Sequence, residues 1–193
     1  TVILAKHGFK VALIERSDMV GPLLRGFYRK GIFFDTGLHH AGGFGEGGPV
    51  DVFSRYLGLS KRLRKVPSNP DSFDIVRFAD PHFEFRFPSG YERLRENLHD
   101  VFPRDTRAVD EYLDAVKAQC SLLPYVNLEA DFGTLEVLKS VHGPSLKEFL
   151  DQFTENTILK QVLSVHCLLN GVPPDEQAIV NYAHIVGPYY ESV

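Results

Sequence analysis

The chain has 193 residues, of which 44% are hydrophobic and 24% charged, values typical of a globular protein with a buried core. Its 21 basic and 25 acidic residues give a formal net charge of -4, so it has no excess of positive charge with which to bind a nucleic acid. Two cysteines are too few for a disulfide framework, and no apolar run approaches the roughly 20 residues of a membrane-spanning helix. We expect a protein in a reduced compartment, either cytoplasmic or peripheral to a membrane, with no signal peptide visible.

The first fifteen residues predict a short helix and then a strand. Residues 2–4 are apolar, Lys6 and His7 suit a helix C-terminus, and Gly8 fits the left-handed position that follows one. The apolar run over 10–15 ends at Glu15, a pattern typical of the second strand of a dinucleotide-binding βαβ unit, where the acid holds ribose hydroxyls. Only nine residues precede this run. We therefore expect the chain to begin inside a longer protein, after the first strand and its phosphate loop.

A hairpin and a helix are predicted over residues 21–60. After a loop through Gly21 and Pro22, "GFYRKGIFFDTG" alternates apolar runs about a turn at Lys30-Gly31. The segment "PVDVFSRYLGL" has helical spacing, with Pro49 suited to the first turn.

Residues 43–48, "GFGEGG", match the phosphate-loop pattern G-x-G-x-x-G letter for letter. A true phosphate loop follows a buried strand and opens a helix. This one follows "HHA", carries Glu46 where an anion would sit, and has the acid-ended strand before it rather than after. We interpret it as a turn beside a ligand and not as a phosphate loop.

A basic, proline-broken connector, "KRLRKVPSNPDS", leads to a second predicted hairpin over 73–87 that turns at Asp80-Pro81. Phe83, Phe85 and Phe87 alternate with charged residues, so one face is aromatic. This aromatic face has two interpretations: a core surface packed on the following helices, or the wall of an apolar tunnel.

Helices are predicted for the remainder. Capping boxes Ser89-x-x-Glu92 and Ser145-x-x-Glu148 each open one. A longer helix is expected over about 104–123, and another after Pro173-Pro174. The apolar stripe of the longer helix consists of Val109, Tyr112, Leu113 and Val116.

The passage "VALIERSDMVGPLLRGFYRKGIFFDTGLHHAGG" resembles the flavoprotein family of phytoene desaturases, carotenoid isomerases and retinol saturases, in which an acid-ended strand leads to a Gly-Gly turn, a short aromatic arm and an "fD.G.H" segment. Pro22 stands where the family has the second glycine. The segment "GVPPDEQAIVNYAHIVGPYYESV" resembles the family's middle region. The matching residues of the first passage are Glu15, Gly21, Phe27, Gly31, Phe34, Asp35, Gly37 and His39.

The resemblance covers nearly the whole chain and is most specific in the first 50 residues. It implies an α/β, mixed α+β fold: a partial FAD/NAD(P)-binding, Rossmann-like segment over 1–60, then part of a substrate (cap) domain over 61–193 with an antiparallel hairpin and helices. The N-terminal phosphate loop and the C-terminal flavin-contacting segment of the family have no counterpart in these residues. We therefore expect little or no activity from the 193-residue fragment alone.

The resemblance also implies an activity, that of an FAD-dependent oxidoreductase acting on a lipophilic polyene or isoprenoid substrate. Desaturation, saturation and isomerisation all stay open, each by hydride transfer with the flavin. Such chemistry needs no protein nucleophile, and no catalytic residue is assigned. The expected partner is a lipophilic small molecule, with peripheral membrane contact left open and oligomeric state unknown.

Six residues are carried over as cofactor-binding candidates. Glu15 is assigned to the adenosine ribose, Gly21 to a close backbone approach, and Gly37 with His39 to a flavin-proximal turn. Two arginines of the same segment are assigned to the adenine edge and the phosphates. The complete set is Glu15, Arg16, Gly21, Arg25, Gly37 and His39.

Other chemistries are weaker interpretations of the same residues. Asp35, His39 and His40 do not predict a metal site, because adjacent histidines on a strand point to opposite faces and further ligands are lacking at suitable spacing. His166-Cys167 falls on an apolar, helix-like stretch and is interpreted as core rather than as a catalytic dyad.

Two other function classes stay open at this point. One is a non-catalytic interaction domain derived from an oxidoreductase. The other is an NAD-dependent Rossmann enzyme, which would share Glu15 but would not explain "FFDTGLHH".

Overall fold

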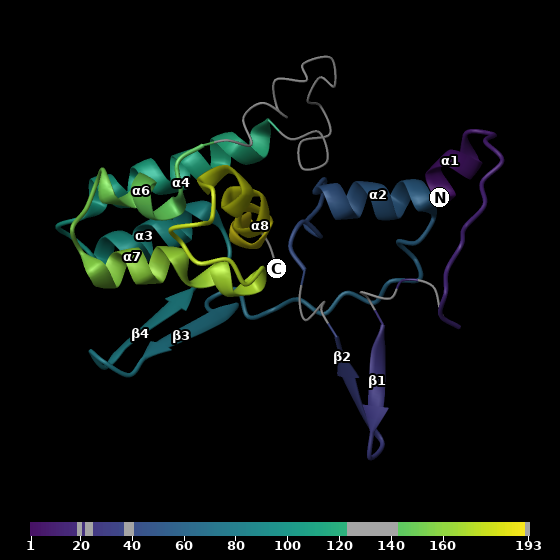
Figure 1. The fold of residues 1–193 in the computed structure, drawn as a ribbon, viewed down its shortest axis with the longest axis horizontal. Coiled ribbons are helices and arrows are strands. Elements are labelled where there is room, and N and C mark those ends of the chain that lie inside the picture. Colours follow the sequence, from purple (N-terminus) through teal and green to yellow (C-terminus); the bar gives the residue numbers. More distant parts are fainter. Residues whose placement is uncertain (19–20, 22–24, 37–40, 123–142, 192–193) are drawn as a thin grey trace.

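The computed structural model describes residues 1–18, 21, 25–36, 41–122 and 143–191 (Figure 1). It contains a mixture of helices and two small antiparallel hairpins, in agreement with the coarse expectation. The elements in chain order are α1 (Val2–Lys6), β1 (Gly26–Arg29), β2 (Ile32–Asp35), α2 (Pro49–Leu57), β3 (Asp74–Phe78), β4 (Phe83–Phe87), α3 (Tyr91–Val101), α4 (Thr106–Ser121), α6 (Leu146–Asp151), α7 (Thr157–Ser164), the 3-10 helix η1 (Val165–Leu169) and α8 (Ile179–Glu191).

The short helix α1 ends as its sequence predicts. Gly8 has a φ of 84°, and the amide of Phe9 donates to the carbonyl of Leu4 at 3.1 Å, closing the helix with a left-handed residue. The strand expected next is wrong for this structure, because residues 9–15 form neither helix nor strand. A strand requires hydrogen bonds to a neighbour, and no described strand pairs with this segment. As a result Leu13 and Ile14 are exposed.

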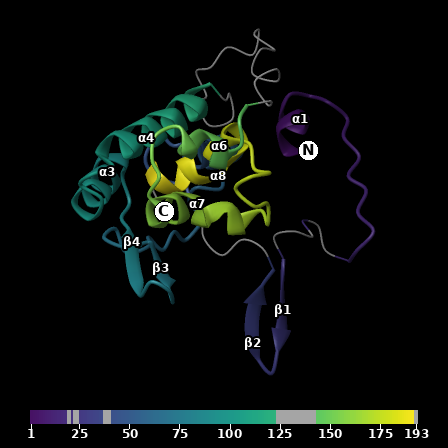
Figure 2. The same cartoon turned by 60° about the vertical axis from the view of Figure 1, so that its left-hand side comes forward.

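The first hairpin is confirmed. Gly26 to Arg29 pair with Asp35 to Ile32 around Lys30 and Gly31, whose φ angles of 51° and 78° are both left-handed. A two-residue loop with two positive φ angles matches the twist of antiparallel strands, and Gly31 adopts this conformation without strain. In Figures 1 and 2 this hairpin projects away from the helices.

The second hairpin joins the core. β3 and β4 pair in antiparallel register, with Phe85 and Phe87 buried and Glu84 and Arg86 exposed. Phe87 is fully buried, and its ring lies edge-on to that of Phe85 at 4.8 Å between centroids. The aromatic face is therefore a core surface. The core interpretation is confirmed for Phe85 and Phe87, whereas Phe83 is half-buried.

Only one of the two predicted capping boxes forms. At α6, Ser145 Oγ accepts from the amide of Glu148 at 3.1 Å while the Glu148 carboxylate accepts from the amide of Ser145 at 2.9 Å. At α3 the prediction is wrong: the cap is Gly90, one residue later, and its amide donates to the carbonyl of Tyr190 on α8. The tertiary contact with α8 shifts the helix start, which leaves the buried Ser89 hydroxyl without a hydrogen-bond partner in the described structure.

The helical core forms around α8, which packs on α4, with α3, α6 and η1 also in contact (Figure 2). All four residues of the predicted α4 stripe are buried. The helix expected after Pro174 begins later, at Ile179. Residues 174–176 form a turn, and Ala178 then pairs with Ser145 in an isolated bridge, beside which the carbonyl of Gln177 accepts from the amide of Leu146 at 2.7 Å. Helix α7 and η1 were not predicted individually.

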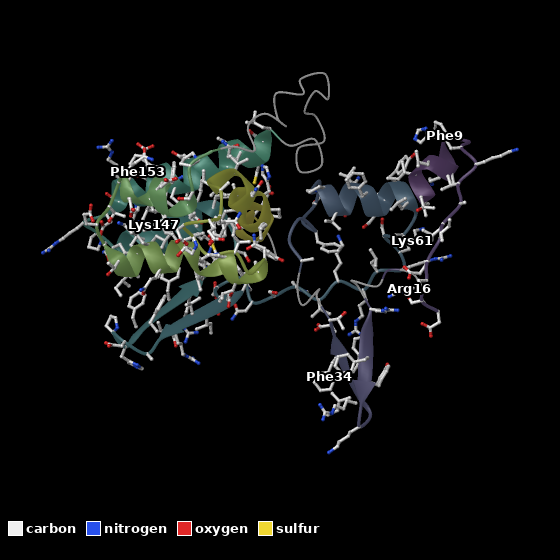
Figure 3. The ribbon with its side chains drawn as sticks, viewed as in Figure 1. Phe9, Arg16, Phe34, Lys61, Lys147 and Phe153 are labelled. Carbon is white, nitrogen blue, oxygen red and sulfur yellow. The ribbon has the colours of Figure 1, made fainter. Side chains whose placement is uncertain are left out.

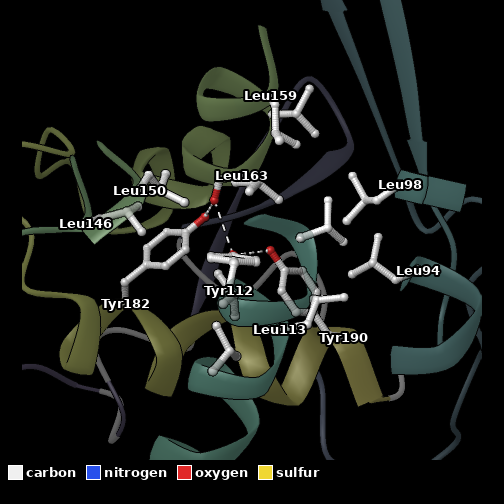
Figure 4. Close-up of a cluster of buried hydrophobic side chains, with 14 of the residues drawn as sticks. Leu94, Leu98, Tyr112, Leu113, Leu146, Leu150, Leu159, Leu163, Tyr182 and Tyr190 are labelled. Carbon is white, nitrogen blue, oxygen red and sulfur yellow. Dashed lines mark hydrogen bonds between the residues drawn. The ribbon is translucent and has the colours of Figure 1, made fainter. Parts of the chain in front are cut away.

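Three tyrosines connect the core helices (Figure 4). The hydroxyls of Tyr112 on α4 and Tyr190 on α8 lie 2.8 Å apart. Tyr112 and Tyr182 both donate to the carbonyl of Leu163 on α7, at 3.2 and 2.7 Å. Their polar ends are satisfied inside the protein, as buried hydroxyls require.

The glycine-rich loop over 41–48 meets the helical core at α8. A side chain at Gly42 would lie 2.2 Å from the carbonyl oxygen of Pro188. The absence of a side chain at this position allows the loop, and α2 after it, to approach α8.

Candidate functional site

The candidate site begins at Glu15, the carboxylate singled out by the sequence. Its Oε1 accepts from the backbone amide of Ser17 at 2.8 Å and from the Ser17 hydroxyl at 2.6 Å. These two bonds, with a contribution from the charge of Arg25, lower the pKa of Glu15. The carboxylate is thus ionised at neutral pH and held in one orientation, with both bonds on one of its two oxygens.

Arg25 lies on the adjoining segment, immediately before β1. Its backbone carbonyl accepts from the hydroxyl of Thr36, just after β2, so the base of the hairpin is closed beside it. The charge of Arg25 makes the smallest of the contributions that lower the pKa of Glu15. Glu15 and Arg25 are two of the six candidate residues, and they come from different segments of the chain.

The other candidates are less closely placed. Arg16 is exposed (Figure 3), and Gly21 has a φ of 76°, with no atom within 4 Å of the point where a side chain would begin. Gly21 therefore supplies a turn that other residues rarely adopt and leaves space around it. Gly37 and His39, like His40 and Pro22, lie outside the described residues.

The glycine-rich loop caps its own helix. The carbonyl of Gly43 accepts from the amides of Val50 and Asp51, at 3.1 and 3.4 Å, and Gly48 donates to Gly45 at 2.9 Å. The Asp51 carboxylate accepts from the amide of Gly47 at 3.3 Å and from Lys65 at 3.1 Å. The amides of Gly47, Gly48, Val50 and Asp51 are thus occupied by groups of the loop and the helix, which supports the interpretation of "GFGEGG" as a turn.

These residues fit one end of a dinucleotide. An oriented carboxylate can accept hydroxyl protons from a ribose, and an acid at this place would repel a 2′-phosphate. A pyrophosphate needs a cradle of free amides, usually at a helix N-terminus. Among the residues that the structure describes, the glycine loop before α2 does not offer one. Of the parts of a dinucleotide, these residues could therefore hold only a ribose.

His166 and Cys167 lie in the core, as expected. The His166 ring is nearly fully buried against Phe73, Phe87 and Tyr190, and its Nε2 lies 3.3 Å from a carboxylate oxygen of Asp74. Burial raises the pKa of the Cys167 thiol to about 11. A thiol that stays protonated at neutral pH is a poor nucleophile, which supports the interpretation of this pair as core.

One site residue was not foreseen. Ser17 orients Glu15, and its signal in the sequence is only a hydroxyl two residues after an acid, a spacing that permits a local hydrogen bond to the carboxylate.

Charged side chains line a groove elsewhere in the described part of the chain. A groove of about 530 Å³ between α6 and α7 is crossed by Asp151, which binds Lys147 at 2.5 Å and Lys160 at 2.6 Å. None of the candidate residues lines it. No group of metal-ligating side chains occurs within residues 1–18, 21, 25–36, 41–122 and 143–191. In the same ranges, no helix combines the length and apolar character needed to cross a bilayer.

Comparison with known proteins shows which family the chain matches. Residues 2–187 match the family described as flavin containing amine oxidoreductase. The chain is 29% identical over 204 aligned residues to human all-trans-retinol 13,14-reductase and 30% identical to the Macaca fascicularis protein of the same name; each alignment covers 97% of this chain. A Danio rerio protein named inactive all-trans-retinol 13,14-reductase is 25% identical over 60% of the chain. No solved structure matches.

The chain spans about a third of the length of these retinol reductases, since the aligned part is 33% of the human protein. The family match itself covers almost every residue of the chain. The chain belongs to the family of flavin-containing amine oxidoreductases.

Proposed function

We propose that this chain is part of an FAD-dependent oxidoreductase that reduces a retinoid-like polyene, and that its own contribution is to hold the adenosine end of the cofactor. The observation that carries the proposal is the Glu15 carboxylate, ionised and oriented by Ser17, in a chain that matches a flavin family over 2–187. FAD is proposed over a flavin without adenosine because a carboxylate of this kind serves a ribose.

The proposed division of labour follows the chain. Residues 1–60 form the cofactor side, a partial Rossmann-like segment, and residues 61–193 belong to the substrate side, or cap. Bound flavin supplies the two-electron redox chemistry. Glu15 accepts hydrogen bonds from the ribose hydroxyls. Arg25 and Arg16 lie near enough in sequence to serve the phosphates and the adenine edge, respectively. Gly21 leaves room for the cofactor. Gly37 and His39 stay candidates for the flavin-proximal turn.

The substrate class is inferred from the relatives, whose names specify reduction of all-trans-retinol. Reduction is therefore preferred to the desaturation and isomerisation that the sequence left open. A lipophilic substrate also makes peripheral membrane contact part of the proposal. The nicotinamide alternative is not carried forward, since the matched family is flavin-containing.

The test uses the natural full-length protein with Glu15→Gln, which keeps the shape of the side chain and removes its charge. We expect the variant to lose FAD affinity about tenfold or more, because charge-assisted hydrogen bonds contribute about 1.5–3 kcal/mol. Glu155→Gln is the matched control, since the Glu155 side chain is 96% exposed and remote in sequence. FAD retention is measured by absorbance after gel filtration. Equal retention in both variants would remove Glu15 from the site.

Activity is tested anaerobically with all-trans-retinol in two parallel reactions, one in which a chemical reductant keeps the flavin reduced and one in which the flavin is supplied oxidised. A product heavier by two hydrogen atoms in mass spectrometry supports reduction. A product lighter by two supports desaturation, and an unchanged mass with a new retention time supports isomerisation.

The second candidate function, a non-catalytic domain of oxidoreductase origin, is favoured by the likeness to a relative named as inactive. It predicts that the full-length protein gives no new product while FAD binding depends on Glu15. For the 193-residue chain alone we expect no stoichiometric FAD binding in a fluorescence titration. A 1:1 end point at micromolar FAD would contradict the proposal that a phosphate cradle outside the described residues is required.

A further inference from the structure

We propose that Gly42 is a positioning residue, whose backbone contact with α8 sets the distance between the cofactor side and the substrate side of the protein. The inference rests on the proposed function, which assigns the cofactor to residues 1–60 and the substrate to residues 61–193. A methyl group built on Gly42 would lie 2.2 Å from the carbonyl oxygen of Pro188 and 2.8 Å from the nitrogen of Tyr189. Packed carbon atoms stay about 3.5 Å apart. The two backbones therefore touch without room for a side chain.

The turn of α8 that meets Gly42 is fixed from within the core. A methyl group built on Gly187 would lie 2.2 Å from Sγ of Cys120 on α4. The carbonyl of Gly187 accepts from the hydroxyl of Tyr91 on α3 at 3.4 Å, and Tyr190 is fully buried. Because protein interiors are close-packed, a helix held in this way does not yield to a neighbour without moving others.

The loop is also held next to Gly42. The carbonyl of Gly43 accepts from the first two amides that follow Pro49 in α2. The carbonyl of Phe44 accepts from Lys65 Nζ at 2.9 Å, and the same ammonium group lies 5.4 Å from the centroid of the Phe44 ring. Three consecutive residues, 42–44, are thus attached to α8, to α2 and to the connector after α2. Such a loop moves as a unit.

The consequence concerns the distance between flavin and substrate. His39, a candidate for the flavin-proximal turn, precedes Gly42 by three residues, which span at most about 11 Å of chain. A side chain at Gly42 has to displace the loop from α8 by about 1 Å to reach an ordinary contact distance. A misplacement of 1 Å between reacting groups can lower a rate about 100-fold. Gly42 therefore acts on the reaction through the loop that carries it.

The experiment compares Gly42→Ala with Gly143→Ala in the natural full-length protein loaded with FAD. Gly143 is the matched control, since it also packs on α8, but a methyl group there would meet only side-chain methyl groups of Val180 and Ile179, at 3.3 and 3.7 Å. Both variants should retain FAD, because Glu15 is unchanged. Visible circular dichroism of the oxidised, bound flavin reports the surroundings of its ring. We expect it to change in Gly42→Ala only.

The second measurement is the anaerobic reoxidation of chemically reduced flavin by all-trans-retinol in a single turnover. Two electrons and two protons pass to one carbon–carbon double bond of retinol, and the flavin is left oxidised. We expect this rate to fall about 100-fold in Gly42→Ala and to stay unchanged in Gly143→Ala. Reoxidation by ferricyanide, a small oxidant that needs no place in the substrate site, should be the same in both variants.

Unchanged flavin circular dichroism in Gly42→Ala would overturn the inference, as would an equal fall of both reoxidation rates. Loss of FAD from this variant would also overturn it, because Gly42 would then belong to the cofactor site. If retinol does not reoxidise the flavin of the original protein, the proposed function fails, and the circular dichroism still decides the inference.

A second pair of variants tests the same contact from α8 should Gly42→Ala not fold. In Gly187→Ala the new methyl group presses on Cys120, and Gly187→Ala/Cys120→Ala removes the sulfur atom that it would meet. We expect Gly187→Ala to change the flavin circular dichroism and the double variant to restore it. A change that the double variant does not reverse would contradict a connection between α8 and the flavin through the loop.

Discussion

The hydroxyl of Tyr112 on α4 links this helix to two others, α7 and α8. It donates to the carbonyl of Leu163 and lies within hydrogen-bond distance of the Tyr190 hydroxyl. Burial raises the pKa of Tyr112, so the hydroxyl stays protonated and able to donate across the ordinary pH range.

Replacing Tyr112 by Phe removes only that oxygen. We expect the free energy of unfolding to fall by about 1–3 kcal/mol, because the Leu163 carbonyl and the Tyr190 hydroxyl each lose a partner inside the protein. Urea denaturation followed by circular dichroism measures the change. Tyr28→Phe, at a residue that is 75% exposed, is the control and should stay within about 0.5 kcal/mol of the original. Similar values for the two variants would contradict the role of the buried hydroxyl.

The two cysteines provide a test of burial by reactivity. Burial raises the pKa of each thiol from 9.0 to about 11. Near pH 8 the thiolate fraction is then about 100-fold smaller than in the unfolded chain. We expect a disulfide reagent to react far more slowly with the folded chain than with chain in denaturant. Because the pKa of each thiol is higher in the folded chain than in the unfolded chain, burial of the protonated thiols contributes to stability. This contribution is present below pH 9 and is lost as pH rises towards 11. Equally fast reaction in the native state would show the thiols to be accessible.

At the scale of elements, the starts of α3 and α6 show that the same local motif forms its cap at one helix and not at another. Ser145-x-x-Glu148 and Ser89-x-x-Glu92 are the same motif, yet only the first forms its reciprocal hydrogen bonds. The α3 start is displaced because Gly90 donates to Tyr190 on α8, a residue far away in the chain.

The matched pair Ser145→Ala and Ser89→Ala separates these cases. Ser145→Ala is expected to lower the free energy of unfolding by about 1 kcal/mol through loss of the cap. Ser89→Ala is expected to be neutral or stabilising, since it deletes a buried hydroxyl that has no partner in the described structure. Thermal or urea unfolding of both variants measures this. A larger cost at Ser89 would mean that its hydroxyl makes a cap after all.

At the scale of the whole molecule, the described residues differ greatly in how deeply they are buried. The core draws on β4, α3, α4, α6, α7, η1 and α8, whereas α1, the segment up to Glu15 and the first hairpin contribute no residue to it. Arg95 on α3 is bound to Asp110 and Asp114 of α4, and Lys160 to Asp151.

The order of cleavage in a limited digestion with trypsin should follow this difference in burial. We expect the first cuts after Lys10, Arg16 and Lys30, which are exposed, and late cuts after Arg95 and Lys160, whose side chains are 20% exposed and ion-paired within helices. Proteolysis requires an extended backbone, and local opening is least costly where few apolar contacts are lost. Mass spectrometry of a time course identifies the order. Cuts after Arg95 as early as those after Lys10 would contradict it.

Local patterns by themselves determined much of this protein. The Lys30-Gly31 turn, the Pro49 entry to α2, the Ser145 cap and the α4 stripe depend on interactions within a few residues or on apolar periodicity, so their sequences specify them. The resemblance of the first fifty residues also led to the flavin family that residues 2–187 match.

Tertiary structure decided the features that depend on partners distant in the chain. An apolar run ending in an acid is typical of a strand, but residues 10–15 meet no strand partner in the described structure and form none. The later start of α3 follows from a hydrogen bond to Tyr190, and that of α8 comes after the bridge between Ala178 and Ser145. Whether an aromatic face becomes core, as in β4, or stays exposed, as in β1 and β2, depends on whether another element packs against it. Periodicity cannot specify this, because it records only which side chains share a face and not what covers that face.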